Sequence, residues 1–141
     1  MRHMTLLLAV LFVVVTAMPA LAQTICVENA FGQYLKFDGV SLVKGSTTLL
    51  RGEYHFDSSD LASTVPFVGA VTLLSDGETT NIGITSYPDA ADDVLAVAWF
   101  MVGNNKFDAT GDYYNSPYTT TAGADTWTNV SCTSAPFKSV E

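Results

Sequence analysis

The chain has 141 residues, of which 48% are hydrophobic and only 14% charged, and its formal net charge at pH 7 is −8. This length fits one domain that can bury a core of its own. The acidic balance argues against binding to nucleic acid or to anionic membrane surfaces, because like charges repel. An acidic surface also favours solubility, which is the simpler explanation of the charge.

The first 22 residues are typical of an export signal rather than of folded structure. Arg2 supplies a positive charge, Leu6 to Val15 is a continuous apolar core, and Ala20-Leu21-Ala22 fits the small-x-small cleavage rule. We expect cleavage before Gln23, which leaves residues 23–141 as a single secreted or periplasmic domain with no membrane segment. An uncleaved anchor is the alternative, but the apolar core is short for a membrane span.

Two cysteines, Cys26 and Cys132, lie near opposite ends of this predicted domain. In an exported protein an even pair of cysteines indicates a disulfide. On the chain-entropy model, closing so long a loop stabilises the folded state by about 4 to 5 kcal/mol. The bond would also make the first and last strands neighbours, because bonded cysteines need close Cα atoms. Two separate buried thiols remain the alternative.

Short alternating runs separated by turn residues follow the signal, and no helical period of useful length appears. Gln23 to Glu28 and Gly32 to Asp38 are the first predicted strands, and a brief strand from Ser41 to Val43 comes next. Thr47 to Phe56 alternates best and predicts a strand with one inward and one mostly wet face. The inward face holds Leu50, Gly52, Tyr54 and Phe56, and the wet face holds Leu49, Arg51, Glu53 and His55.

In the second half, Pro66 to Ser75 and Thr79 to Tyr87 flank Asp76-Gly77, a strong hairpin signal. Val94 to Val102 is apolar throughout and predicts a strand buried on both faces. Lys106 to Tyr114 would return as its antiparallel partner, and Asp125 to Cys132 is the last strand. Seven or eight strands with short turns predict an all-β fold: an antiparallel up-and-down barrel, or a sandwich, closed by one disulfide.

The tripeptide Gly-x-Tyr occurs three times, at Gly32-Gln33-Tyr34, Gly52-Glu53-Tyr54 and Gly111-Asp112-Tyr113. The strand period of two puts the glycine and the tyrosine of each repeat on one face. A strand glycine lets the sheet bend or lets a neighbouring ring lie over bare backbone, which is the interpretation that we favour. The functional interpretation is a set of tyrosines that line a cavity.

Strands with Gly-x-Tyr in a small secreted barrel are similar to the avidin-like and lipocalin-like groups. The segment Val94 to Tyr114 (VLAVAWFMVGNNKFDATGDYY) most resembles an avidin hairpin. The Gly-x-Trp opening typical of both groups is absent, and Gly32-Gln33-Tyr34 stands in its place. The resemblance implies a barrel, and it supports no transfer of a ligand or of site residues.

Little in residues 23–141 points to catalysis, and we expect that the protein is not an enzyme. The single histidine of this region, His55, is predicted on a wet strand face, although Asp57, Ser58 and Ser59 lie nearby in sequence. A catalytic triad is defined by geometry rather than by sequence proximity. A small hydrolase centred on His55 is therefore the less favoured alternative.

Metal binding is also poorly supported. One histidine and two bonded cysteines are too few for a closed zinc shell. Calcium accepts carboxylates from loops, and Asp89, Asp92 and Asp93 are the candidates in one acidic connection. No acidic cluster has the spacing of an EF-hand loop. We therefore expect no metal and no cofactor.

Aromatic residues are the remaining candidates for a binding site, because Tyr and Trp offer sugars or apolar ligands a flat ring together with a hydrogen-bonding group. The candidate ligand-binding residues are Tyr34, Tyr54, Tyr113 and Trp127. We expect an exported binding module for a small apolar or sugar-like ligand or for a protein partner. The alternative is a surface protein that self-associates as a homo-oligomer through the predicted strand Val94 to Val102. Its candidate interface residues are Val97, Trp99 and Met101.

Overall fold

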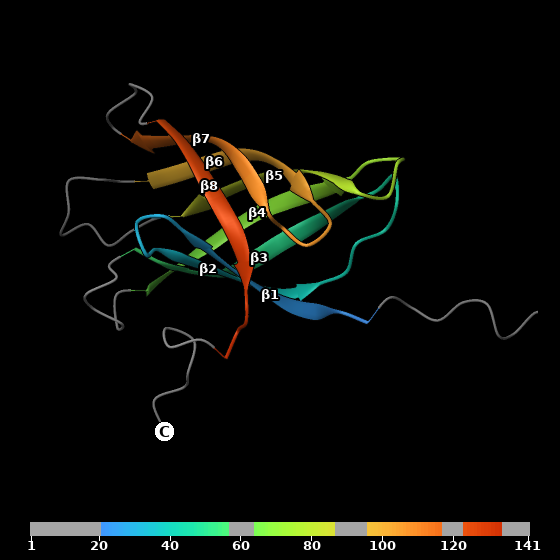
Figure 1. The fold of residues 1–141 in the computed structure, drawn as a ribbon, viewed down its shortest axis with the longest axis horizontal. Helices are drawn as coiled ribbons and strands as arrows, with labels where there is room; N and C mark the ends of the chain where they lie inside the picture. The colour runs from blue at the N-terminus through green and yellow to red at the C-terminus, as the bar shows by residue number, and fades with distance from the viewer. Residues whose placement is uncertain (1–20, 57–63, 87–95, 117–122, 134–141) are drawn as a thin grey trace, which may run out of the picture.

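The computed structural model describes residues 21–56, 64–86, 96–116 and 123–133. Eight antiparallel strands in this part of the chain close into one barrel, in which neighbours in sequence are neighbours in space and β8 pairs with β1 (Figure 1). The strands are β1 (Gln23–Asn29), β2 (Tyr34–Val40), β3 (Thr47–His55), β4 (Thr64–Leu73), β5 (Thr79–Ser86), β6 (Ala96–Asn104), β7 (Ala109–Ser116) and β8 (Gly123–Val130).

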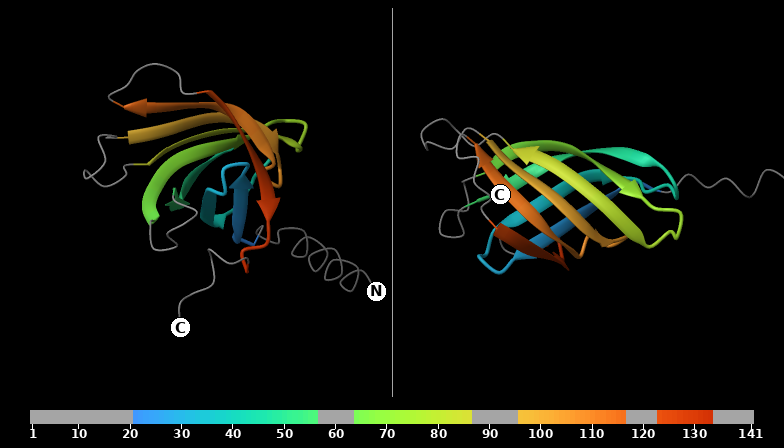
Figure 2. Two further views of the ribbon diagram at one scale, coloured as in Figure 1. Left: turned by 60° about the vertical axis from the view of Figure 1, so that its left-hand side comes forward. Right: turned by 90° about the horizontal axis from the view of Figure 1, so that it is seen from above.

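The predicted up-and-down barrel is therefore confirmed, and the alternative sandwich is not the fold. It is also the architecture that the avidin-like and lipocalin-like resemblance implied. Both views of Figure 2 show the strands wrapping around a single interior. No helix that is long and apolar enough to cross a membrane occurs in the described residues.

The predicted brief strand from Ser41 to Val43 is wrong. These residues belong to the connection between β2 and β3, where Gly45 adopts a left-handed φ of 74°. The backbone N–H of Ser46 donates to the Val43 carbonyl at 3.0 Å, which closes a turn. The connection also bonds to β4, because the backbone N–H of Gly45 donates to the Leu73 carbonyl at 2.8 Å. β2 itself ends at Val40.

Two of the Gly-x-Tyr glycines lie where strands approach closely, as the structural interpretation predicts. A Cβ on Gly52 would overlap the Lys36 carbonyl oxygen and lie 2.7 Å from Cζ of Phe67, so the Phe67 ring covers bare backbone. A Cβ on Gly111 would overlap the Phe100 carbonyl oxygen. Gly32 differs, because it lies in the β1–β2 turn with a φ of 73°.

The barrel has two distinct ends. Turns join β2 to β3, β4 to β5 and β6 to β7 at one end, which we call the Phe107 end. The opposite end, where β1 finishes and β2 begins, we call the Asn29 end. The barrel interior between them is filled by apolar side chains from alternating strand positions, including Leu35, Phe37, Phe67, Val71 and Ile84.

Phe107 closes its end of the barrel. It is a turn residue with a φ of 68°, a left-handed conformation that costs a non-glycine residue about 1 to 2 kcal/mol. Its side chain is nevertheless only 1% exposed, and its ring lies 4.8 Å from that of Phe37. Burial of the aromatic ring offsets the backbone cost, since a phenylalanine buries a large apolar area.

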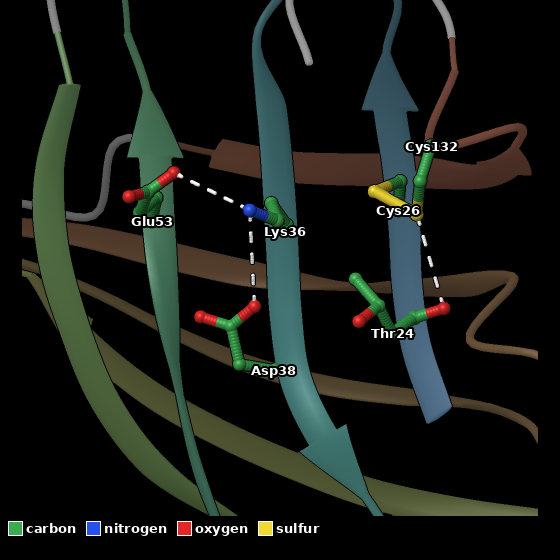
Figure 3. Close-up of polar contacts among 6 residues, drawn as sticks. All are labelled: Thr24, Cys26, Lys36, Asp38, Glu53 and Cys132. Carbon is green, nitrogen blue, oxygen red and sulfur yellow. Dashed lines mark hydrogen bonds and ion pairs between the residues drawn. A yellow bond between two sulfur atoms is a disulfide. The ribbon is translucent and has the colours of Figure 1, made fainter. Parts of the chain in front are cut away.

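The predicted disulfide between Cys26 and Cys132 is present and joins residues 106 apart in sequence (Figure 3). The two Cα atoms are 5.2 Å apart, and the bond lies beside the β1–β8 ladder that closes the barrel. It is consistent with an oxidising compartment.

Figure 3 also shows Lys36 between Asp38 and Glu53, at 3.9 Å from each carboxylate. Such exposed ion pairs contribute little to stability.

The prediction that the Val94 to Val102 run is buried on both faces is wrong for its outward face. In β6, Val97, Trp99 and Met101 point into the interior and are at most 8% exposed. Phe100 and Val102 point outward and are 62% and 58% exposed. A barrel wall is a single layer, so an apolar strand within it keeps one face on the surface. Interior packing therefore occupies the three residues that the sequence nominated for an interface.

Candidate ligand-binding site

Asn29 organises the end of the barrel at which it lies. It is the last residue of β1 and only 5% exposed. Its side-chain oxygen accepts hydrogen bonds from the backbone N–H groups of Phe31 and Gln33, both at 3.0 Å. Its amide nitrogen donates to Oε1 of Gln33 at 2.8 Å and to Oδ2 of Asp125 at 3.0 Å. These bonds use both its donors and both its acceptor positions, so the side chain has one defined orientation.

Asp125 brings a carboxylate into this cluster from β8. It is 6% exposed and lies on the same inward face of β8 as Trp127. Besides the bond from Asn29, its Oδ1 accepts the backbone N–H of Thr126 at 3.0 Å. An ionised carboxylate offers about four acceptor positions. Two of these positions therefore have no donor among the described residues.

Three aromatic side chains border these polar groups. The rings of Tyr54 and Trp99 lie 4.8 Å apart, and those of Trp99 and Trp127 lie 6.1 Å apart, each pair in an edge-to-face arrangement. All three side chains are at most 5% exposed. Tyr54 comes from β3, Trp99 from β6 and Trp127 from β8, so barrel closure is what brings them together.

Two polar atoms of these rings have no protein partner in the described part of the chain. Nε1 of Trp127 is buried and has no acceptor there. The Tyr54 hydroxyl makes no hydrogen bond with a described residue. Burial raises the pKa of Tyr54 above its ordinary value of 10, and the Asp125 carboxylate and Tyr113 raise it further. The phenol is thus protonated at neutral pH and can donate.

The four aromatic residues that were predicted to bind a ligand do not all lie together in the structure. Tyr54 and Trp127 belong to the cluster, and Tyr113 is partly buried and packs against the core. Tyr34 lies on the outer surface instead, where its hydroxyl donates to Oε1 of Glu28 at 2.9 Å. The pKa of Tyr34 is raised, mainly by burial and also by Glu28. The first residue of strand β2 therefore faces away from the barrel interior.

Asn29, Gln33 and Asp125 were not predicted as site residues, and Trp99 was predicted for the interface rather than for ligand binding. Asn29 and Gln33 flank a turn in the sequence, which is a common structural position for such residues. One feature of the sequence could have identified Asp125 as a site residue: it shares a strand face with Trp127 in an alternating run. A carboxylate on the apolar face of a strand indicates a buried polar site. Only the meeting of β1 with β8 shows its partner.

His55 lies in a different environment from the one predicted. It is on the outward face of β3 but only 6% exposed, beside Tyr34 and Thr64 of the neighbouring strands. The prediction of a wet histidine is therefore wrong. Burial lowers its pKa, Glu53 partly opposes this, and Lys36 adds to the lowering. Asp57, Ser58 and Ser59, considered with it for a hydrolase, lie outside the described residues.

The calcium candidates Asp89, Asp92 and Asp93 also lie outside the described residues. Within the described ranges, no three or more His, Cys, Asp or Glu side chains come together as a metal-binding group. The cluster around Asn29 contains one carboxylate and two amides, which suit hydrogen-bond recognition.

Comparison of the chain with models of known protein families, with curated proteins and with solved structures finds no match.

Proposed function

We propose that the barrel is an exported binding module that holds a small apolar or sugar-like ligand at its Asn29 end, without catalysis. The observation that carries the proposal is the buried Nε1 of Trp127, which has no hydrogen-bond partner among the described residues and belongs to a group of aromatic rings near the Asp125 carboxylate. Asp125 offers acceptor positions, and Tyr54 and Trp127 offer donors. A buried donor left without an acceptor costs about 1 to 3 kcal/mol. A ligand that accepts from Trp127 would recover this free energy.

The arrangement favours a ligand with two different parts. Its polar part carries both a donor for Asp125 and an acceptor for Tyr54 or Trp127, as a sugar hydroxyl does. Its apolar part packs on the rings of Tyr54 and Trp99, which have flat faces suited to sugar rings and other planar groups. Phe107 fills the opposite end, so the ligand enters from the Asn29 end.

Export is part of the proposal. The N-terminal pattern of residues 1–22 and the disulfide between Cys26 and Cys132 both support a secreted or periplasmic protein. Cleavage before Gln23 would leave the barrel intact, because β1 begins at that residue. N-terminal sequencing of the exported protein tests this part. A first residue other than Gln23 would contradict it.

Intrinsic fluorescence tests the binding proposal directly, because the only two tryptophans of the chain, Trp99 and Trp127, both belong to the site. The exported protein is titrated with a panel of free monosaccharides and, separately, with the apolar probe 1-anilinonaphthalene-8-sulfonate. We expect a saturable change in tryptophan emission with at least one probe. Native mass spectrometry of the same preparation detects any small molecule that co-purifies.

Variants identify the groups that bind. Asp125→Asn replaces two carboxylate acceptors by one amide oxygen, and Trp127→Phe keeps a ring but removes the N–H donor. Each should weaken binding at least tenfold, the effect of losing about 1.4 kcal/mol. Thr128→Ala is the matched control, because Thr128 is the exposed neighbour of Trp127 on β8. Equal affinity of all three variants and the native protein would refute the proposed site.

A further inference from the structure

Asp125 is the only carboxylate that is buried among the described residues. β4, β5 and β6 contain no Asp, Glu, Lys or Arg. In the other strands the remaining charged side chains lie on the outward face of the wall: Glu28, Lys36, Asp38, Arg51, Glu53 and Asp112. Asp125 faces inward on β8, which lies beside β1 at the barrel seam (Figure 1). The inward face of the described strands thus carries a single charge, and that charge is negative.

No positive side chain neutralises this carboxylate within the described ranges. The ion pairs there are those of Lys36, on the outward face. Asp125 accepts instead from two neutral donors, the Asn29 amide and the backbone N–H of Thr126, both at 3.0 Å. Asn29 needs only an acceptor, which an amide oxygen would supply without any charge. Burying a charge without an opposite charge is costly, so the choice of a carboxylate here favours a positively charged ligand.

Aromatic rings near Asp125 favour an organic cation over a metal ion. Trp127 follows two residues later on the same face of β8, and its ring is 6.1 Å from that of Trp99. Burial raises the pKa of Tyr54, and the charge of Asp125 raises it further, so these two groups are close. Ring faces attract ammonium groups, most strongly where water is excluded. A metal ion needs several ligands, and the described residues hold no group of three His, Cys, Asp or Glu side chains.

Trp127 adds a second requirement for the ligand. Its buried Nε1 has no acceptor among the described residues, and an oxygen atom on the ligand would provide one. The protonated hydroxyl of Tyr54 can donate to the ligand as well. An ammonium group for Asp125 and a neighbouring oxygen for these donors occur together in amino sugars and in other small amino alcohols.

We propose that the site at the Asn29 end takes a small hydroxylated amine in its ammonium form, such as an amino sugar, with Asp125 as the partner of the positive charge. This inference rests on the proposed function, because it names the ligand class of the same site. The ammonium group donates to the carboxylate, and a ligand oxygen accepts from Nε1 of Trp127. The net charge of −8 on the whole chain attracts such a cation and repels anionic competitors.

Matched pairs of ligands test the charge requirement on the native exported protein. D-Glucosamine and D-glucose differ by an amino group in place of one hydroxyl, and ethanolamine and ethylene glycol differ in the same way. At about pH 6 both amines are protonated, since amino groups ordinarily have pKa values near 8 or above. Tryptophan fluorescence titrations should show at least tenfold tighter binding of the amine. A preference for the amine in either pair supports the inference, and no preference in both pairs overturns it.

Two carboxylate variants distinguish a specific contact from general attraction to an acidic protein. Asp125→Asn removes the buried charge and should reduce the preference for the amine to within about twofold of its neutral counterpart. Asp112→Asn is the matched control, because it changes the net charge equally at an exposed position on β7, and it should keep the preference. Circular dichroism verifies that both variants are folded. Loss of the preference in both variants, or in neither, would contradict the role of Asp125.

The same titrations distinguish this inference from the proposed function. Saturable binding of a neutral sugar or of 1-anilinonaphthalene-8-sulfonate, without a preference for amines, overturns the inference and leaves the binding site in place. No saturable change with any probe refutes both. Trp127→Phe should weaken the amine and its neutral counterpart equally, because its N–H group serves the ligand oxygen. A change in their ratio in this variant would contradict the assignment of the ammonium group to Asp125.

Discussion

Asn29 of β1 donates a hydrogen bond of 3.0 Å to the carboxylate of Asp125 on β8, 96 residues later in the chain. The bond crosses the seam at which the first and last strands close the barrel, and the Cys26–Cys132 disulfide lies beside the same seam. The two features stabilise the seam in different ways. The disulfide restricts the unfolded chain, whereas the hydrogen bond holds one polar group in place.

Asn29→Ala should destabilise the barrel by about 3 kcal/mol, because it leaves the buried Asp125 carboxylate and the β1–β2 turn without their partner. Chemical denaturation measures the change in the free energy of unfolding. Asn105→Ala is the control, since Asn105 is exposed and makes one long bond of 3.3 Å to Gly77. It should change stability by less than about 0.5 kcal/mol. Equal effects of the two substitutions would show that Asn29 has no special role.

Replacing both cysteines by alanine should lower the free energy of unfolding by about 4 kcal/mol, given the separation of 106 residues. The barrel should still form, because the β1–β8 backbone ladder remains. Far-ultraviolet circular dichroism tests the fold, and guanidinium denaturation tests the stability. Adding a reductant should destabilise the native protein and leave the double variant unchanged. A double variant as stable as the native protein would contradict the entropic argument.

Phe107→Ala should cost about 3 to 5 kcal/mol, since it removes a fully buried ring from the end of the barrel. The loss of contact with Phe37 adds to the cavity that the substitution leaves. Phe31→Ala is the matched control, because Phe31 is 70% exposed in another turn. Thermal denaturation of both variants compares the loss of stability at the buried ring with that at the exposed ring. A small effect at Phe107 would mean that its ring does not close the barrel.

Gly52→Ala should destabilise the barrel by about 3 kcal/mol or more, because overpacking forces backbone and side chains apart. The added methyl group would overlap the Lys36 carbonyl oxygen on the adjacent strand. Gly83→Ala is the contrasting substitution, because its new Cβ would lie 3.7 Å from the nearest atom, on the Phe100 ring. It should be neutral or stabilising by up to about 1 kcal/mol, as alanine restricts the unfolded chain more than glycine does. Similar losses at both positions would contradict the close approach at Gly52.

The Asp76 carboxylate makes stability depend on pH in the acid range. The Thr79 hydroxyl and the backbone N–H groups of Thr79 and Glu78 donate to it and lower its pKa from 3.8 to about 2. Because the pKa is lower in the folded state, the contribution to stability is present above pH 4 and is lost as the pH falls toward 2. Carboxyl chemical shifts should give a midpoint near 2, which Thr79→Val raises. Thr126→Val, on another strand, should leave the midpoint unchanged.

The fold was largely predictable from local sequence pattern. Alternation in Thr47 to Phe56, the Asp76-Gly77 turn and the paired cysteines each correspond to an element of the structure. These signals are visible because strand period, turn geometry and disulfide formation depend on residues close in sequence or on a single pair. Barrel and sandwich could not be distinguished, since both satisfy the same alternation.

The candidate site was predictable only in part. Tyr54 and Trp127 stood out as aromatic residues, whereas Asn29 and Asp125 looked like ordinary turn and strand-edge residues. Their significance depends on a contact between the two ends of the chain, and no local pattern encodes it. Neighbouring strands likewise decide that Tyr34 lies on the outer surface of the barrel and that His55 is buried.

The sequence by itself determined that the chain is all-β, that its end strands are linked, and that β4 to β6 lack charge. Tertiary structure decided which face of each strand points inward, because barrel closure assigns one side of every strand to the interior. Closure thus put Trp99 beside Tyr54 and left Phe100 on the surface. It likewise turned Val97 and Met101 inward and left Val102 on the surface.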